Sequence, residues 1–203
     1  MSIANLEVEL AAEPEAPSKL LTIEEFLALP EDDGIERDLI DGRLVEQPMS
    51  RRNPDHGGTE ANIIFLLKDW LGRQPEPRGR IYGADTAFRL RTEPQTLVGI
   101  DVAYTSAESV ATWKRNRKRS YFEGPPILAV EILSPSDTHA RVSEKVATYL
   151  DVGTVVWVVD PDLKTVIVYR PGASVQIFGE ADELVADPYL PGFRVAVARI
   201  FED

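Results

Sequence analysis

Residues 127–160, ILAVEILSPSDTHARVSEKVATYLDVGTVVWVVD, are the part of this chain from which its fold can best be inferred. It predicts a buried strand, a turn, an amphipathic helix and a second buried strand. The first strand is almost wholly apolar between Ile127 and Leu133, which is typical of a strand covered on both faces. The carboxylate of Glu131 is the exception in that run.

Glu131 needs a partner if its strand is buried. An ionised carboxylate loses its hydration in such a place, and a metal ion, a cation or hydrogen bonds must compensate for the loss. Glu131 is therefore a metal ligand, one half of a buried ion pair, or a carboxylate at the edge of its strand. The local sequence is compatible with each interpretation.

The helix that follows brings a lysine towards the same place. Three good N-capping residues, Ser136–Thr138, precede it, and Gly153 can end it. An apolar stripe with helical spacing starts at Val142, and Lys145 lies three residues later, on or beside that stripe. Lys145 therefore leans towards the strand that carries Glu131. A lysine whose aliphatic stem merely covers apolar surface would show the same spacing.

Apolar periodicity and turn residues predict the remaining elements. Helices are expected at 22–29, behind a Thr22–Glu25 capping box, and at 59–72. Strands are expected on both sides of the turn Asp41-Gly42 and at 80–91, 97–104, 154–160, 164–170, 175–178 and 193–200. Residues 50–57 are expected to form a loop. This pattern predicts an α/β or α+β fold, with a mixed sheet and a few helices.

Length and composition indicate a globular protein. The chain has 203 residues, of which 43% are hydrophobic, so we expect a flexible acidic tail over residues 1–18 and a single domain over 19–203. No stretch is apolar for long enough to cross a bilayer, and no secretory signal is apparent. The chain contains no cysteine, which excludes disulfides and thiolate ligands. We expect a cytoplasmic protein.

The charge is acidic overall but unevenly distributed. A net charge of −12 argues against a general nucleic-acid binder. Residues 1–38 carry eleven acids and two bases, whereas residues 68–120 carry eleven bases and six acids, a net +5. KRNRKR, residues 114–119, places five bases in six positions. This segment is either a solvated loop or a mobile basic loop that contacts phosphates.

Asp101 interrupts the apolar strand at 97–104 in the way that Glu131 interrupts its own strand. Two carboxylates on neighbouring strands can share a hard divalent cation such as Mg²⁺. Such a cation polarises a phosphoryl oxygen and lowers the pKa of a bound water. An ammonium group such as that of Lys145 can orient that water or stabilise the charge that develops on the phosphate. The three residues together predict a site for phosphodiester hydrolysis.

In order and spacing these residues resemble the PD-(D/E)XK nuclease superfamily. More closely, residues 20–200 resemble the Uma-type family of restriction-endonuclease-like proteins. The shared marks are LIDGRLVE (39–46), His56, GIDVAY (99–104), EILSPS (131–136) and WVVDP (157–161). The resemblance implies a restriction-endonuclease-like core, a mixed sheet flanked by helices, and cleavage of DNA with Mg²⁺ or Mn²⁺ as the cofactor. It also implies a homodimer.

Carried over by position, Asp101 and Glu131 would be the metal ligands and Lys145 the motif lysine. The commoner superfamily pattern has this lysine two residues after the glutamate, where this chain has Leu133. The lysine would therefore come from the helix, as it does in the Uma-type family. Asp38, where the family normally has a glutamate, would complete the catalytic set.

Further residues would assist this set. His56, Ser134 and Glu36 are accessory candidates, although a lone histidine is more often structural. Strand alternation places Glu36 on the same face as Asp38, so Glu36 could substitute for it. DNA contacts are expected from Arg51, Arg52, Lys114, Arg115, Arg117, Lys118 and Arg119.

Two function classes therefore remain open. The intact Asp–Glu–Lys set favours a metal-dependent endonuclease. The charge of −12 favours a non-catalytic protein with a nuclease fold that acts as a binding or structural module. A phosphatase-like or RNA-directed activity is a third, weaker alternative.

Overall fold

A computed structural model describes residues 19–30, 34–48 and 54–202. The helices are α1 (Ile23–Leu27), α2 (Pro54–Gly72), α3 (Ala107–Arg115), α4 (His139–Asp151) and the 3₁₀ helix η1 (Val197–Ile200). The strands are β1 (Ile35–Ile40), β2 (Arg43–Pro48), β3 (Arg80–Arg91), β4 (Thr96–Thr105), β5 (Phe122–Glu123), β6 (Leu128–Ile132), β7 (Val155–Asp160), β8 (Thr165–Tyr169), β9 (Gln176–Phe178), β10 (Glu183–Val185) and β11 (Arg194–Ala196).

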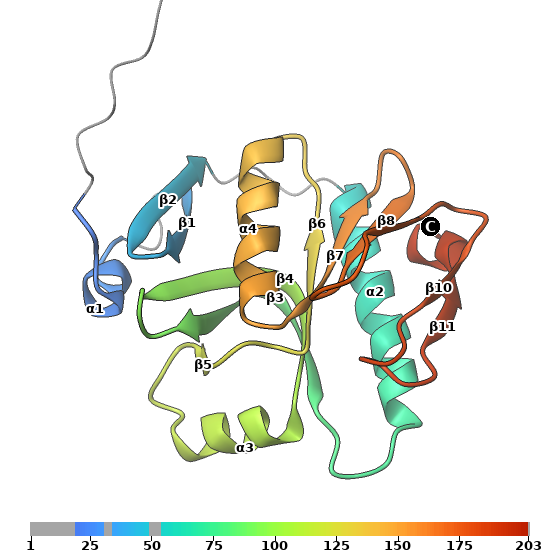
Figure 1. The fold of residues 1–203 in the computed structure, drawn as a ribbon, viewed down its shortest axis with the longest axis horizontal. Coiled ribbons are helices and arrows are strands. Elements are labelled where there is room, and N and C mark those ends of the chain that lie inside the picture. The colour runs from blue at the N-terminus through green and yellow to red at the C-terminus, as the bar shows by residue number, and fades with distance from the viewer. Residues whose placement is uncertain (1–18, 31–33, 49–53, 203) are drawn as a thin grey trace, which may run out of the picture.

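Within these residues the strands form a nine-stranded mixed sheet and a small two-stranded sheet. The large sheet has the order β2-β1-β4-β6-β7-β8-β9, and β3 pairs with both β4 and β5. In Figure 1, α4 lies in front of this sheet and α2 behind it. The predicted mixed sheet with flanking helices is confirmed.

The decisive stretch forms the predicted β6–α4–β7 unit, in which β6 and β7 are parallel neighbours and α4 crosses between them. Thr138 is the N-cap of α4, because its hydroxyl accepts a hydrogen bond from Arg141 N at 3.3 Å. Gly153 follows the helix with a φ of +83°, a conformation that glycine adopts without steric cost. The capping box of α1 and the β1–β2 hairpin are also confirmed.

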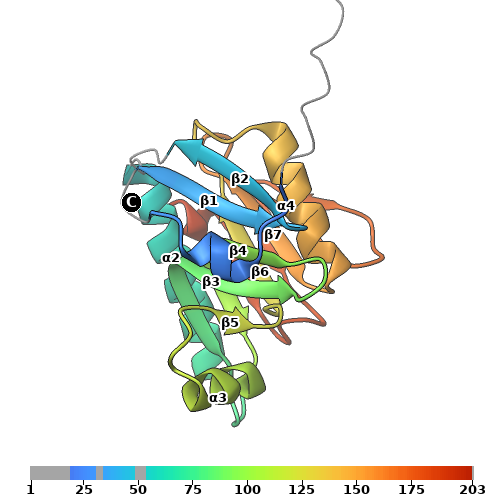
Figure 2. The ribbon, with the colours of Figure 1, turned by 90° about the vertical axis from the view of Figure 1, so that its left-hand side faces the viewer.

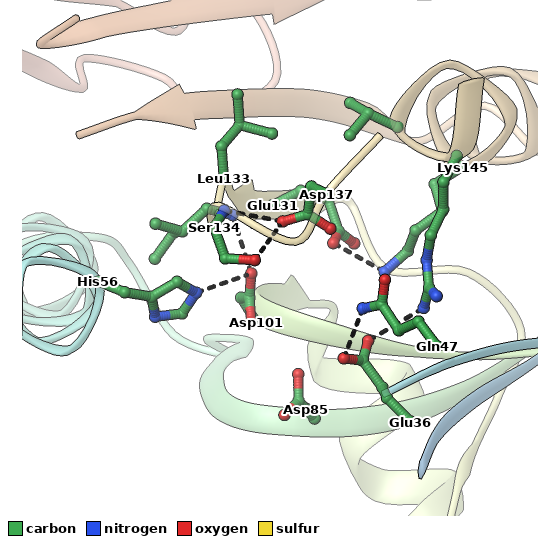
Figure 3. Close-up of a pocket in the computed structure, with 13 residues that line it drawn as sticks. Glu36, Gln47, His56, Asp85, Asp101, Glu131, Leu133, Ser134, Asp137 and Lys145 are labelled. Carbon is green, nitrogen blue, oxygen red and sulfur yellow. Dashed lines mark hydrogen bonds and ion pairs between the residues drawn. The ribbon is translucent and has the colours of Figure 1, made fainter. Parts of the chain in front are cut away.

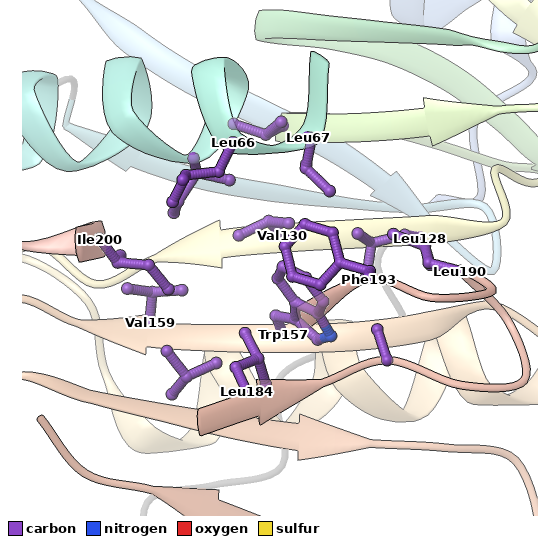
Figure 4. Packing of buried hydrophobic residues seen from close by; sticks show 14 of the residues in the cluster. Leu66, Leu67, Leu128, Val130, Trp157, Val159, Leu184, Leu190, Phe193 and Ile200 are labelled. Carbon is purple, nitrogen blue, oxygen red and sulfur yellow. The ribbon is translucent and has the colours of Figure 1, made fainter. Parts of the chain in front are cut away.

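Two hydrophobic clusters fix which side of each strand faces which helix. The larger cluster packs α2 and the C-terminal segment against the sheet, with Leu67, Val130 and Phe193 among its members (Figure 4). The other lies under α4 and includes Ala129. Since side chains alternate along a strand, Glu131 must face α4 together with Ala129.

Two local predictions were wrong. Helix α2 begins at Pro54 and not at Thr59, because proline lacks an N–H and has a helical φ, which suits the first helical position. His56 therefore lies in the first turn of α2. The strand expected at 193–200 ends at Ala196, and Val197 then starts η1, which buries Val197 and Ile200.

Some elements were not predicted. Helix α3, which Ser106 caps, and the short strands β5 and β10 carry weak periodic signals. The expected tail at 1–18, Arg51 and Arg52 lie outside the described residues. In the part of the chain that the structure describes, no helix is both long and apolar enough to cross a membrane.

Candidate active site

The candidate site forms where the central strand β4 changes partners. Strand β3 pairs along the whole of one edge of β4. On the other edge, β1 pairs at Leu97 and β6 pairs from Val102 to Tyr104. Between these two contacts, no described strand pairs with this second edge of β4 at 98–101. Side chains therefore bind the backbone there, and this is where the charged residues gather.

Asp101 and Glu131 meet at the end of the β4–β6 pairing. The register pairs Val102 with Val130, so one further step places Asp101 opposite Glu131. Asp101 Oδ2 accepts a hydrogen bond of 2.8 Å from Ile132 N, which takes the place of the next rung of the ladder. The buried Asp101 carboxylate is thus held by the strand that carries Glu131.

Asp101 also contacts the first turn of α2. The Nε2 atom of His56, which is buried in the first turn of that helix, lies 3.7 Å from Asp101 Oδ2. Burial alone would raise the pKa of Asp101. The contact with His56, the bond from Ile132 N and the charge of Lys145 outweigh burial and lower that pKa, so the carboxylate is ionised at neutral pH.

Lys145 reaches the same place from α4. Its Nζ donates to Glu131 Oε2 at 2.7 Å and to the Gly99 carbonyl at 3.1 Å, and lies 4.0 Å from Asp38 Oδ2. The side chain is buried, which by itself would lower the pKa of Lys145. The charges of Glu131 and Asp38 outweigh this effect and raise the pKa well above its ordinary value, so the ammonium stays charged.

Glu131 accepts a second short hydrogen bond, from the hydroxyl of Tyr149 to Oε1 at 2.6 Å. Burial raises the pKa of the Glu131 carboxyl group to about 7, and the neighbouring Asp101 adds to the rise. The bonds from Lys145 and Tyr149 act in the opposite direction. The charge of Glu131 therefore changes close to neutral pH.

Asp38 and Glu36 form the third side of the site through α4. Asp38 is 1% exposed, and its Oδ1 accepts from Gly99 N at 3.1 Å. Arg141 Nη2 donates to Asp38 Oδ2 and to Glu36 Oε1, both at 3.1 Å. The β1–β2 hairpin and α4 lie side by side in Figure 2, as these contacts require. Gln47 Nε2 donates to Glu36 Oε2 at 2.7 Å.

These groups border a pocket of about 330 Å³. Figure 3 shows His56, Asp101 and Glu131 on one side of it and Glu36 and Gln47 on the other. Its lining residues are Glu36, Gln47, His56, Asp85, Asp101, Glu131, Ile132, Leu133, Ser134, Asp137, Arg141, Val142 and Lys145. Asp38 does not line the pocket, but it contacts Arg141 and Lys145, which do.

A β-bulge in β3 contributes Asp85. The register shifts between Gly83 and Thr86, and Ala84 and Asp85 have φ values of 58° and 52°. Such conformations are costly for residues other than glycine, and bulges re-aim side chains near functional sites. Here the bulge brings Asp85 to the wall of the pocket, below Asp101 in Figure 3.

The donor set fits a hydrated Mg²⁺ ion. Asp101 and Glu131 offer carboxylate oxygens side by side, and Mg²⁺ is typically held by one or two carboxylates while it keeps several waters. Among the described residues there is no group of three or more His, Asp or Glu side chains arranged to hold a metal ion. The pair thus fits a cation that takes its remaining ligands from water and substrate.

The other predicted residues are not all brought to this place. Ser134 lies at the rim of the pocket, where its hydroxyl bonds Asp137 Oδ2 at 2.8 Å and shapes the turn before α4. The basic cluster, defined as Lys114, Arg115, Arg117, Lys118 and Arg119, does not line the pocket. It occupies the end of α3 and the turn after it, which Figures 1 and 2 place opposite the first turns of α2 and α4.

The sequence analysis missed four residues of the site. Arg141 and Tyr149 lie four residues before and after Lys145, so helical spacing places all three on one face of α4. The sequence therefore contained a signal, this helical spacing, that could have identified Arg141 and Tyr149. Gln47 and Asp85 carried no comparable signal, because their places depend on the hairpin and on the bulge.

The fold and these carboxylates define a class of protein. Its members have a restriction-endonuclease-like fold, and here a charged pocket lies where β1 and β6 leave part of one edge of β4 without a partner among the described strands. The family model described as "Uma2: Putative restriction endonuclease" matches residues 23–198. The chain belongs to this family.

A solved structure shares the fold. It is titled as the crystal structure of "a putative nuclease belonging to DUF820" from Anabaena variabilis. That protein is 24% identical, with a TM-score of 0.72, and the match covers 89% of this chain and 97% of the other. No curated protein matches the chain.

Proposed function

We propose that the protein is a Mg²⁺-dependent endonuclease that hydrolyses phosphodiester bonds in DNA, with Asp101, Glu131 and Lys145 as its central residues and Asp38 beneath them. The main support for this proposal is that two carboxylates and one ammonium group converge beside the part of the β4 edge that no described strand pairs with, where Lys145 Nζ lies 2.7 Å from Glu131 Oε2. The description of the family supports the same activity.

Asp101 and Glu131 would hold Mg²⁺, or Mn²⁺ in its place. When bound, such an ion polarises a phosphoryl oxygen and lowers the pKa of water. Hydrolysis joins a water oxygen to phosphorus and breaks the bond to one ester oxygen, which takes up a proton. The chain's own contribution is to fix the groups around this reaction: Ile132 N and His56 orient Asp101, and Tyr149 and Lys145 orient Glu131.

Lys145 also supplies positive charge next to the carboxylates. Since its pKa is raised, it remains an ammonium that can hold the attacking water or stabilise charge on the phosphate. Asp38 contributes from below, because it binds Gly99 N and lies 4.0 Å from Lys145 Nζ. His56, Ser134 and Glu36 are accessory residues in this proposal.

The proposal includes DNA as the partner, with the basic cluster, Arg51 and Arg52 as contacts to its backbone. It also includes a homodimer, which light scattering would test by its mass. Two exposed apolar residues support a contact between subunits at the outer strand β9. Val175, just before this strand, is 51% accessible, and Ile177, within it, is 68% accessible. The DNA substrate and the lack of cysteine support a cytoplasmic location.

Plasmid nicking tests the activity. The wild type should nick supercoiled DNA with Mg²⁺ and not with a chelator. Asp101→Ala should abolish nicking, because it removes one of the two proposed ligands. Lys145→Ala should slow it by roughly 10²-fold or more, the scale for losing one preorganised charge. The exposed Asp162→Ala and Lys164→Ala are matched controls and should nick like the wild type. Activity that survives both site substitutions would remove the assignment.

A non-catalytic binding module is the second candidate, and the net charge of −12 favours it. It predicts no cleavage with either metal, and DNA binding that Asp101→Ala does not change. A thermal-shift titration separates the two candidates further. A cation that binds the folded state raises the melting temperature, and the endonuclease proposal expects this rise to disappear in Asp101→Ala.

A further inference from the structure

Arg141 is the second cation of the pocket, and its guanidinium has more donors than the described residues satisfy. The side chain is only 10% exposed, and Nη2 donates to both Glu36 and Asp38. Nη1 is buried and has no hydrogen-bond acceptor among the described residues. An arginine carries five N–H donors in a rigid plane. A buried donor without a partner at the wall of a pocket indicates a ligand that supplies the acceptor.

If Arg141 moves, each of its two carboxylate partners still has another hydrogen bond. Asp38 keeps the bond from Gly99 N at 3.1 Å, and Glu36 keeps the bond from Gln47 Nε2 at 2.7 Å. Lys145 differs, because its Nζ is held by the main-chain carbonyl of Gly99 as well as by Glu131. Of the two cations, Arg141 is therefore the one whose donors are available to an incoming group.

The charge of the pocket indicates what that group is. Its lining includes five carboxylates, those of Glu36, Asp85, Asp101, Glu131 and Asp137. An anionic phosphodiester would be repelled by these groups unless a cation contacts it directly. A guanidinium matches two oxygens of a phosphate with two parallel N–H donors, which an ammonium cannot do.

We propose that Arg141 is a phosphate-contacting catalytic residue, whose guanidinium turns from Glu36 and Asp38 to donate to the non-bridging oxygens of the scissile phosphate. This inference rests on the endonuclease function proposed above. Lys145 stays beside Glu131, so the two cations of α4 have different roles. Lys145 contacts the carboxylates and the water, and Arg141 donates to the phosphate.

Three variants test this assignment. Arg141→Gln removes the charge and the planar fork. Arg141→Lys keeps the charge beside Glu36 and Asp38 and removes the fork, so it tests the fork with those ion pairs retained. Arg194→Gln is the matched control, because Arg194 is exposed on β11 and pairs with Glu183 at 3.0 Å, outside the pocket lining.

Two measurements are expected to respond. Single-turnover cleavage with Mg²⁺ should fall roughly 10²–10³-fold in Arg141→Gln and remain reduced in Arg141→Lys. Binding of a short labelled duplex is measured by anisotropy at several salt concentrations, in Ca²⁺ and with the duplex checked for integrity. The slope of log K against log salt should become shallower by about 0.9 in Arg141→Gln, as expected for one lost phosphate contact, and should be retained in Arg141→Lys. The rise in melting temperature with Mg²⁺ should persist in both variants.

The outcomes separate the two proposals. If the wild type cuts DNA and Arg141→Gln matches Arg194→Gln in rate and slope, the assignment of Arg141 is overturned and the endonuclease function stands. Loss of the Mg²⁺-dependent rise in melting temperature in Arg141→Lys would also overturn it, since it would make Arg141 a support of the metal ligands. A wild type that neither binds nor cuts duplex DNA overturns both proposals.

Discussion

At the scale of single residues, the site depends on the balance between burial and charge around Glu131. Its carboxyl group is buried and lies near Asp101, which raises its pKa to about 7, while Lys145 and Tyr149 stabilise its ionised form. A free carboxylate is required for cation binding, so in the function proposed here a proton on Glu131 would exclude Mg²⁺. The state of Glu131 therefore depends on pH in the range where the protein would act.

This balance predicts how Mg²⁺ binding varies with pH. Below the pKa of Glu131, the affinity should fall about tenfold for each pH unit, because one proton competes with the ion. Tyr149→Phe keeps the ring and removes the bond to Oε1, so the pKa of Glu131 should rise and the whole profile should move to higher pH. Calorimetric titrations between pH 6 and 8 would measure both profiles. An affinity that stays constant over this range would contradict Glu131 as a ligand.

At the scale of elements, α4 determines which side chains reach the pocket. One face of this helix carries Arg141, Lys145 and Tyr149, and all three bond residues of β1 or β6. The first turn of the helix fixes the rotation of this face. Of the three candidate caps in the sequence, Thr138 is the one that bonds the helix backbone.

The cap predicts a specific loss of stability. Thr138→Ala should lower the free energy of unfolding by about 1 kcal/mol, the usual value of an N-cap. Ser136→Ala is the control and should have a smaller effect, because the capping hydroxyl is that of Thr138, whereas the Ser136 hydroxyl pairs with that of Ser134. Urea denaturation monitored by circular dichroism would compare the two variants. Equal losses would show that the cap is not where the structure places it.

At the scale of the whole molecule, the exposed basic cluster lies away from the pocket. All five residues of the basic cluster are exposed, and they stand at the opposite end of the molecule from the first turns of α2 and α4. A DNA duplex that contacts both places would have to run along the side of the domain. The cluster would then contribute to binding and not to the chemical step.

This separation predicts different effects on binding and on rate. Replacing Lys114 and Lys118 by Gln should make the salt dependence of DNA binding shallower by about 0.9 for each phosphate contact that is lost. The single-turnover rate at saturating protein should not change. The double variant of Lys68 and Arg73, which are exposed on and just after α2, is the control for net charge. An unchanged slope would favour a basic cluster that is only a solvated surface.

Local signals in the sequence predicted most of the elements and the two candidate carboxylate ligands. The apolar runs of β6 and β7, the caps of α4 and the Asp41-Gly42 turn are local signals, and local signals survive folding because they act between near neighbours. The interruptions at Asp101 and Glu131 could be read as candidate ligands for the same reason, since a carboxylate in a buried strand needs compensation wherever the strand lies.

Which residues come into contact depends on the folded chain as a whole. Asp38 binds Gly99 across 61 residues and Arg141 across 103, and both contacts exist because β1 and β6 leave part of one edge of β4 without a strand. The bulge that brings Asp85 to the pocket likewise depends on the register of β3 against β4. Register and helix rotation are set by the packing of the whole core, and no short stretch of sequence contains them.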